Sequence, residues 1–98
     1  MLHQSSLELK VMLLYFLDHY GPLIVGVSQG DSPTGKFGPL TYSSGHVIVA
    51  VGYEINTDGS VDILVNDPAV SWMRYVIKGS LEEFMLVWDH GGLYVHSL

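Results

Sequence analysis

The sequence contains no cysteine, few basic residues and no long apolar run. Without cysteine, its residues cannot form a disulfide, a zinc–thiolate site or a cysteine nucleophile. Lysine and arginine together number 4 and are scattered, which argues against nucleic-acid binding. No segment reaches the roughly 20 apolar residues of a membrane span. Residues 1–10 lack the basic and apolar regions of a secretory signal. Export as part of a longer precursor is still compatible with the sequence, so the sequence does not fix the compartment.

What the chain does contain is mostly apolar. Hydrophobic residues make up 48% of the 98 positions, and the formal net charge is −6. Charged residues make up 14%, against roughly 25% in an average soluble domain. The length suits a single domain spanning residues 1–98. Such a chain either buries much of its length in a core or presents an apolar face to a partner.

The order of patterns predicts an α+β domain, with an N-terminal helix, a mostly antiparallel sheet and one further helix. The first helix covers residues 5–20 and ends at Gly21-Pro22. A second helix starts at the cap Ser80 and ends near Trp88, and Gly91-Gly92 then breaks the chain. The expected strands are 23–28, 46–54, 61–66, 73–77 and 93–96. The apolar stripe expected on the first helix is Leu7, Val11, Leu14 and Leu17.

A glycine- and proline-rich loop covers residues 29–45. A structureless loop of this length in a compact domain is often functional. A plain surface excursion explains the same composition, and the residues alone do not separate the two interpretations.

The segment Asn56-Thr57-Asp58-Gly59 predicts a hairpin between two of the strands. A turn centred on Thr57 and Asp58 pairs residues 48 with 67, 50 with 65 and 52 with 63. Because side chains alternate along a strand, His46 and Asp67 then become diagonal neighbours on one face, and Asn66 points to the other. The remaining residues of the His46 face are apolar: Ile48, Ala50, Val61, Ile63 and Val65.

His46 and Asp67 at the end of an apolar sheet form a candidate acid–base pair. The carboxylate can accept from one ring nitrogen, which leaves the other nitrogen free to act as a base. Pro68 favours an extended backbone at Asp67. Spacing alone equally allows an ordinary Gly-His strand start and an ordinary Asp-Pro turn.

Several segments together resemble the C-terminal half of the domain that defines a known family. They are GPLIVGVS (21–28), GHVIVAVGY (45–53), VNDPA (65–69), RYVI (74–77), EEFMLVW (82–88) and GGLYV (91–95). In this order they resemble papain-like cysteine peptidases of the bacteriocin-leader-processing type, the peptidase C-thirty-nine-like group. The resemblance covers about residues 7–97. It implies a papain-like β-lobe, peptide or protein substrates and no cofactor, with His46 as catalytic base, Asp67 as its orienting carboxylate and residues 29–45 beside the substrate cleft.

The departure from this family is the missing nucleophile. The family pattern has a cysteine at the start of a helix in an N-terminal lobe, with a glutamine just before it. Gln4 and Gln29 do not occupy that glutamine's place, and Ser43 and Ser44 do not replace the cysteine. The chain by itself is therefore not expected to hydrolyse peptides.

Other residues carry weaker alternatives. His90, His96 and Asp89 suggest metal ligands, but a structural zinc site needs four ligands held together, so we expect exposed histidines. His19 near a helix C-terminus fits the helix dipole. The aromatic residues expected in the core are Trp72, Tyr75, Phe84 and Trp88.

Three interpretations from different classes follow. The chain is part of a cysteine peptidase whose upstream, cysteine-bearing lobe supplies the nucleophile. Alternatively, it is a peptide-binding module without a nucleophile. In the third interpretation, it is an interaction domain that shares only the scaffold with the family.

Overall fold

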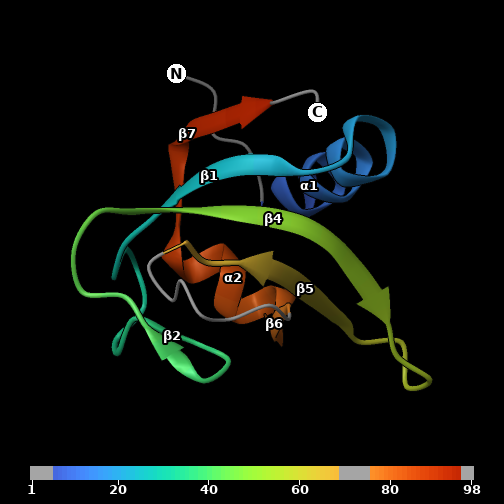
Figure 1. Ribbon diagram of the computed structural model, residues 1–98. Helices are drawn as coiled ribbons and strands as arrows, with labels where there is room; N and C mark the ends of the chain where they lie inside the picture. Colours follow the sequence, from blue (N-terminus) through green and yellow to red (C-terminus); the bar gives the residue numbers. More distant parts are fainter. Residues whose placement is uncertain (1–5, 69–75, 96–98) are drawn as a thin grey trace.

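The computed structural model describes residues 6–68 and 76–95 (Figure 1). Five strands form one sheet in the order β6-β5-β4-β1-β7, and β2 and β3 form a separate two-stranded ribbon. Each described strand pair is antiparallel, so the predicted α+β class is confirmed. The elements are α1 (Ser6–Tyr20), β1 (Leu23–Val27), β2 (Lys36–Phe37), β3 (Leu40–Thr41), β4 (His46–Ile55), β5 (Val61–Asn66), β6 (Ile77–Ser80), α2 (Leu81–Val87) and β7 (Trp88–Val95).

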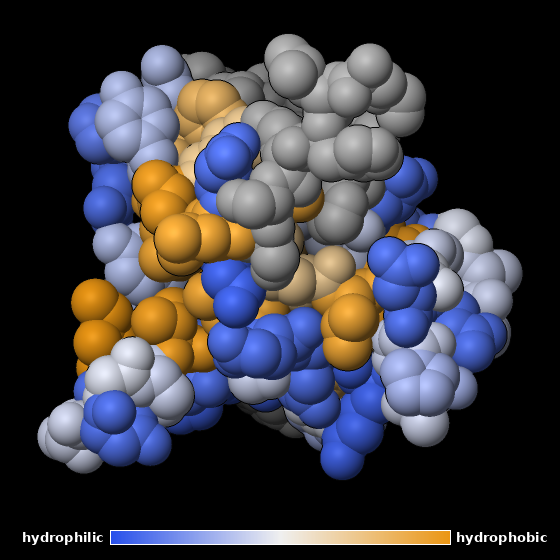
Figure 2. Space-filling model, turned by 180° about the vertical axis from the view of Figure 1, so that it is seen from behind, coloured by the Kyte–Doolittle hydropathy of each residue, from blue (hydrophilic) through white to orange (hydrophobic). Residues whose placement is uncertain are grey.

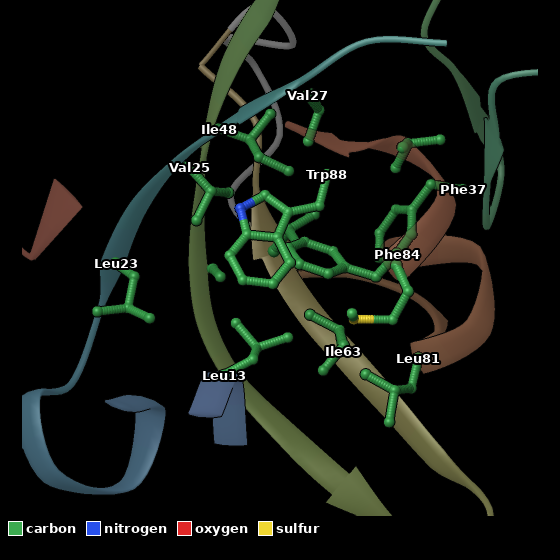
Figure 3. Close-up of a cluster of buried hydrophobic side chains, with 14 of the residues drawn as sticks. Leu13, Leu23, Val25, Val27, Phe37, Ile48, Ile63, Leu81, Phe84 and Trp88 are labelled. Carbon is green, nitrogen blue, oxygen red and sulfur yellow. The ribbon is translucent and has the colours of Figure 1, made fainter. Parts of the chain in front are cut away.

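The core lies between one face of the curled sheet and the two helices. Figure 3 shows side chains of β1, β4 and β5 pointing toward Leu13 of α1 and toward Leu81 and Phe84 of α2. The predicted apolar face of the hairpin is buried at Ile48 and Ile63, and Val61 packs partly buried against it. Phe84 and Trp88 are core residues as expected, whereas Trp72 and Tyr75 lie outside the described residues.

The predicted stripe of α1 was wrong in part. Leu13 and Leu17 are the buried residues of this helix, whereas Leu7 and Val11 are 70% and 59% exposed. Apolar side chains occupy several faces of the helix, so their spacing does not choose which face is buried. The predicted helix end is confirmed, because Gly21 follows Tyr20 with a φ of 74°.

The β4–β5 hairpin keeps the predicted register only near His46. Val49 pairs with Asn66 and Ala50 with Val65, as expected. Beyond a shift between Ala50 and Gly52, the pairing moves by one residue, and Gly52 pairs with Leu64 instead of Ile63. The turn is therefore centred on Asp58, half a residue beyond the predicted centre between Thr57 and Asp58. A bulge in β4 absorbs the difference, so Ala50 before it and Ile63, which pairs with Tyr53 beyond it, both lie buried on the core face.

The segment 29–45 is not structureless. It contains β2 and β3, which are paired through Lys36–Thr41 and Phe37–Leu40. The turn between them uses Gly38, whose φ is 54° and whose N–H donates to Glu83 Oε1 of α2 at 3.0 Å. Phe37 is fully buried against Phe84, with ring centroids 5.9 Å apart. The Phe37–Phe84 ring contact and the Gly38–Glu83 hydrogen bond thus both join this ribbon to α2.

The strands after Pro68 begin at other residues than predicted. β6 shares only Ile77 with the expected strand 73–77, since Val76 precedes the strand and residues 73–75 lie outside the described residues. Pairing of Asp62 with Ser80 extends β6 up to the next helix. β7 begins at Trp88 and runs through the glycines that were expected to break the chain. They lie where its pairing with β1 shifts register, so they serve a bulge.

The predicted start of the second helix is confirmed. Ser80 is the N-cap: its hydroxyl accepts from Glu83 N at 3.0 Å, and Glu83 Oε1 accepts from Ser80 N at 3.3 Å. This reciprocal pair satisfies two donors at the helix start. Glu83 therefore joins the cap of α2 to the β2–β3 turn.

Apolar side chains also reach the surface. Figure 2 shows hydrophobic residues gathered on the back of the molecule and bordered by hydrophilic ones. Within residues 6–68 and 76–95, no helix has both the length and the apolar character needed to cross a membrane. The exposed large apolar residues are Leu7, Val11, Tyr15, Tyr20, Val47, Ile55, Val76 and Leu86.

Candidate functional site

His46 and Asp67 meet at one end of the sheet. His46 is the first residue of β4, and Asp67 directly follows the last residue of β5. His46 Nε2 lies 2.7 Å from Asp67 Oδ1. The histidine side chain is 31% exposed and the aspartate side chain only 4%. The expected contact is therefore present, with the carboxylate buried behind the imidazole; Asn66 is exposed, as alternation predicts.

Tyr42 completes this cluster and was missed by the sequence analysis. Its hydroxyl donates to Asp67 Oδ2 at 3.1 Å, and its ring centroid lies 5.8 Å from that of His46. The tyrosine is 6% exposed although it lies in a glycine- and serine-rich segment. An isolated aromatic residue close before His46 was the available signal, but no periodic pattern marked it as buried.

The three side chains border a cavity of about 330 Å³. Its wall comes from residues 40–46 and Asp67, and Ser43, Ser44 and Gly45 are exposed along it. The resemblance placed residues 29–45 beside a cleft, and the last part of that segment does line this cavity. Within the described residues, no hydrogen bond joins the hydroxyl of either serine to His46.

The two imidazole nitrogens of His46 differ in protonation. A carboxylate only accepts hydrogen bonds, so Nε2 carries the proton toward Asp67 in the neutral ring. Nδ1 then has a free lone pair, and no described residue hydrogen-bonds to it. An imidazole held in one tautomer by a buried carboxylate can accept a proton from a neighbouring group and stabilise the resulting charge.

The pKa of Tyr42 is raised well above its usual value, first by burial and then by the charge and hydrogen bond of Asp67. The hydroxyl therefore stays protonated in the folded state at pH values where an unfolded tyrosine ionises, near pH 10. The unfolded state then binds fewer protons, so stability falls as the pH rises above about 10 and is unaffected below it.

The substitution Tyr42→Phe should remove the part of the stability loss above about pH 10 that the buried hydroxyl causes. We expect the free energy of unfolding of the variant to fall less steeply than that of the wild type above about pH 10. The measurement is urea unfolding from pH 8 to pH 11, and the difference between the two proteins cancels the other tyrosines. If the free energy of unfolding depends on pH in the same way in both proteins, the buried hydroxyl does not have this role.

The remaining candidates lie apart from this cluster. The Gln29 amide donates to Ser32 O and Pro33 O, both at 3.3 Å, within its own loop. His19 Nδ1 donates to Tyr15 O at 2.9 Å at the end of α1. In the described part of the chain, no group of three His, Cys, Asp or Glu side chains could hold a metal ion. The His90 side chain and His96 lie outside that part.

Comparison with known proteins agrees with the motif resemblance. The family model described as Peptidase_C39 like family matches residues 9–93, which is most of the chain. A search of curated proteins and a search of solved structures found no match. The matched segment includes α2, the whole β4–β5 hairpin and the cluster around His46. This protein therefore belongs to the peptidase C39-like family.

Proposed function

We propose that this chain provides the histidine and aspartate half of a cysteine-peptidase site that acts on peptides or proteins. His46 is the general base, and Asp67 is the carboxylate that orients it. The observation that carries this proposal is the 2.7 Å contact between His46 Nε2 and a buried Asp67 oxygen, beside a cavity of about 330 Å³. Membership of a peptidase-like family supports a peptide as the ligand.

The proposed chemistry requires a thiol from outside these residues, because the sequence contains no cysteine. A cysteine-bearing lobe would place its thiol near His46 Nδ1. The thiol proton moves to Nδ1, and the thiolate attacks the peptide carbonyl carbon. The C–N bond then breaks, the amine leaves with the proton from His46, and water hydrolyses the thioester. Asp67 stabilises the imidazolium while it exists. By accepting from Nε2–H, it also keeps the Nδ1 side of the ring directed toward the thiol.

Two features support a second lobe as the partner. In the described structure no hydrogen bond is made to His46 Nδ1, and the ring remains 31% exposed. Large apolar side chains such as Leu7 and Ile55 are exposed by 70% and 69%. A lobe that normally packs against another lobe leaves such surface open when alone.

The chain alone should leave peptides intact, whereas cleavage should appear when a cysteine-bearing lobe of another family member is added. His46→Ala should abolish this cleavage, because the thiol loses its proton acceptor. His19→Ala is the matched control, since His19 is an exposed histidine on α1. The assay is mass spectrometry of a peptide mixture; cleavage that survives His46→Ala would contradict the proposal. The intact mass of the protein in its source cells would tell whether the lobe is on the same polypeptide.

The second candidate is a peptide-binding module that does not cut. It is favoured by one observation: a formed cavity beside His46 in a sequence without cysteine. In that case a pool of unstructured peptides should shift the amide resonances of Thr41, Ser43, Ser44 and Gly45 in an NMR titration. No peptide should be cleaved under any condition, including with an added lobe.

A further inference from the structure

The Asp67 carboxylate accepts two side-chain hydrogen bonds on its two oxygens. Oδ1 accepts from His46 at 2.7 Å and Oδ2 accepts from Tyr42 at 3.1 Å. A carboxyl group rotates easily about its last bond, because the wells of this torsion are broad. A donor on Oδ2 restricts that rotation and so directs Oδ1 at the imidazole.

Tyr42 is itself held in place by the ribbon. Its backbone N–H donates to Gly35 O at 2.8 Å, and Gly35 N–H donates to the buried Ser32 hydroxyl at 2.8 Å. Gly35 has a φ of 71°, and a Cβ at that position would overlap the Tyr42 carbonyl oxygen. The backbone of Tyr42 is therefore fixed by a glycine-dependent turn, independently of its hydroxyl contact.

Tyr42 and Asp67 are both buried. The tyrosine is 6% exposed and the aspartate 5%, and the tyrosine ring lies at 31° to the imidazole. A dry carboxylate interacts more strongly with its donors than one in water. The Tyr42 hydroxyl is protonated in the neutral range like that of any tyrosine, and its raised pKa keeps it a donor at higher pH as well.

We infer that Tyr42 is a positioning residue: its hydroxyl sets the direction of the Asp67 side chain, so that Oδ1 faces His46 Nε2. Tyr42 does not touch the reacting atoms. Its importance for catalysis rests on the proposed function, but its effect on the direction of the Asp67 side chain does not.

The substitution Asp67→Asn makes the direction of this side chain measurable, because its two sides then differ. An amide presents one acceptor and one donor side, whereas the carboxylate presents two acceptors. If Tyr42 keeps the amide oxygen, the NH₂ group faces His46 Nε2, which must then be unprotonated. The His46 proton should therefore move from Nε2 to Nδ1. The readout is the pair of imidazole ¹⁵N chemical shifts at about pH 8.5, above the ordinary histidine range.

The double variant Tyr42→Phe with Asp67→Asn is the decisive case. Without the tyrosine hydroxyl, the amide can turn its oxygen to His46, and the proton should return to Nε2. The matched control combines Asp67→Asn with Tyr53→Phe, because Tyr53 also donates to an aspartate, Asp18, at 2.8 Å but on the exposed surface. This control should keep the proton on Nδ1. A double variant that behaves like its control, or Asp67→Asn that leaves the proton on Nε2, would overturn the inference.

A second measurement covers the case in which the double variant fails to fold. In the single variant Tyr42→Phe, the His46 Nε2 proton should exchange with water faster than in the wild type, because the carboxylate that holds it can rotate. Tyr53→Phe should leave the exchange rate unchanged. Equal rates in the two single variants would refute the role of Tyr42. Neither experiment uses a nucleophile or a peptide, so failure of the inference is distinct from failure of the proposed function.

Discussion

Phe84→Ala is expected to lower the free energy of unfolding by about 3–5 kcal/mol, the range typical of a buried phenylalanine. Phe84 is fully buried on α2 and lies between two other aromatic residues. Its ring centroid is 5.9 Å from that of Phe37 and 5.8 Å from that of Trp88. Truncation leaves a cavity where the β2–β3 ribbon, α2 and the start of β7 meet. Domains of this size have about 5–15 kcal/mol of total stability, so the variant should be marginal.

Leu86→Ala on the same helix is the matched control. Leu86 is 41% exposed, and its contact to Asp31 uses only the backbone carbonyl. We expect a change within about 0.5 kcal/mol, as for other surface substitutions. Urea unfolding followed by circular dichroism measures both variants. Similar losses in the two would mean that the aromatic cluster does not organise the core.

Asp67→Ala is expected to lower the stability by about 1–3 kcal/mol, the cost of leaving a buried hydrogen-bonding group without its partner. The Tyr42 hydroxyl loses its acceptor inside the protein, because both residues are about 5% exposed. His46 loses the group that holds Nε2, and its ring should become mobile. In the proposed peptidase site this variant would also lose the orientation of the base.

Two variants separate the orphaned hydroxyl from general damage. Asn66→Ala changes the neighbouring exposed residue and should have little effect. Adding Tyr42→Phe to Asp67→Ala should recover part of the lost stability, because the unpaired donor is then absent. Denaturant unfolding of the wild type, Asn66→Ala, Asp67→Ala, Tyr42→Phe and the double variant gives the comparison. If the double variant is less stable by the sum of both single losses, the two side chains do not act as a pair.

Much of the fold could be predicted from local signals in the sequence. The turn Asn56–Gly59 and the two alternating segments beside it predicted the hairpin, and the register at Val49 and Ala50 is as expected. Ser80 with Glu83 gave a cap whose hydrogen bonds are both present. These features depend on contacts between residues close in sequence, so spacing and residue type are sufficient to identify them.

Other features depended on contacts that spacing does not encode. The helix α1 offers apolar side chains on several faces, and packing against the sheet selected Leu13 and Leu17 over Leu7 and Val11. The bulge in β4 compensates for a turn that is centred on Asp58 and not between Thr57 and Asp58. A slip without that bulge would have moved the apolar residues of one strand to the other face.

The candidate site also contains features that the sequence predicts and features that depend on tertiary packing. The sequence by itself determined that His46 begins a strand and Asp67 follows its partner strand, because period two and a short turn bring those positions together. It also determined that no cysteine is available in these residues. Only the tertiary structure decided that Tyr42 donates to Asp67 and that residues 40–46 wall the cavity. The reason is that Tyr42 and Asp67 are 25 positions apart in the sequence, and their contact depends on where the β2–β3 ribbon packs against α2, which no local pattern carries.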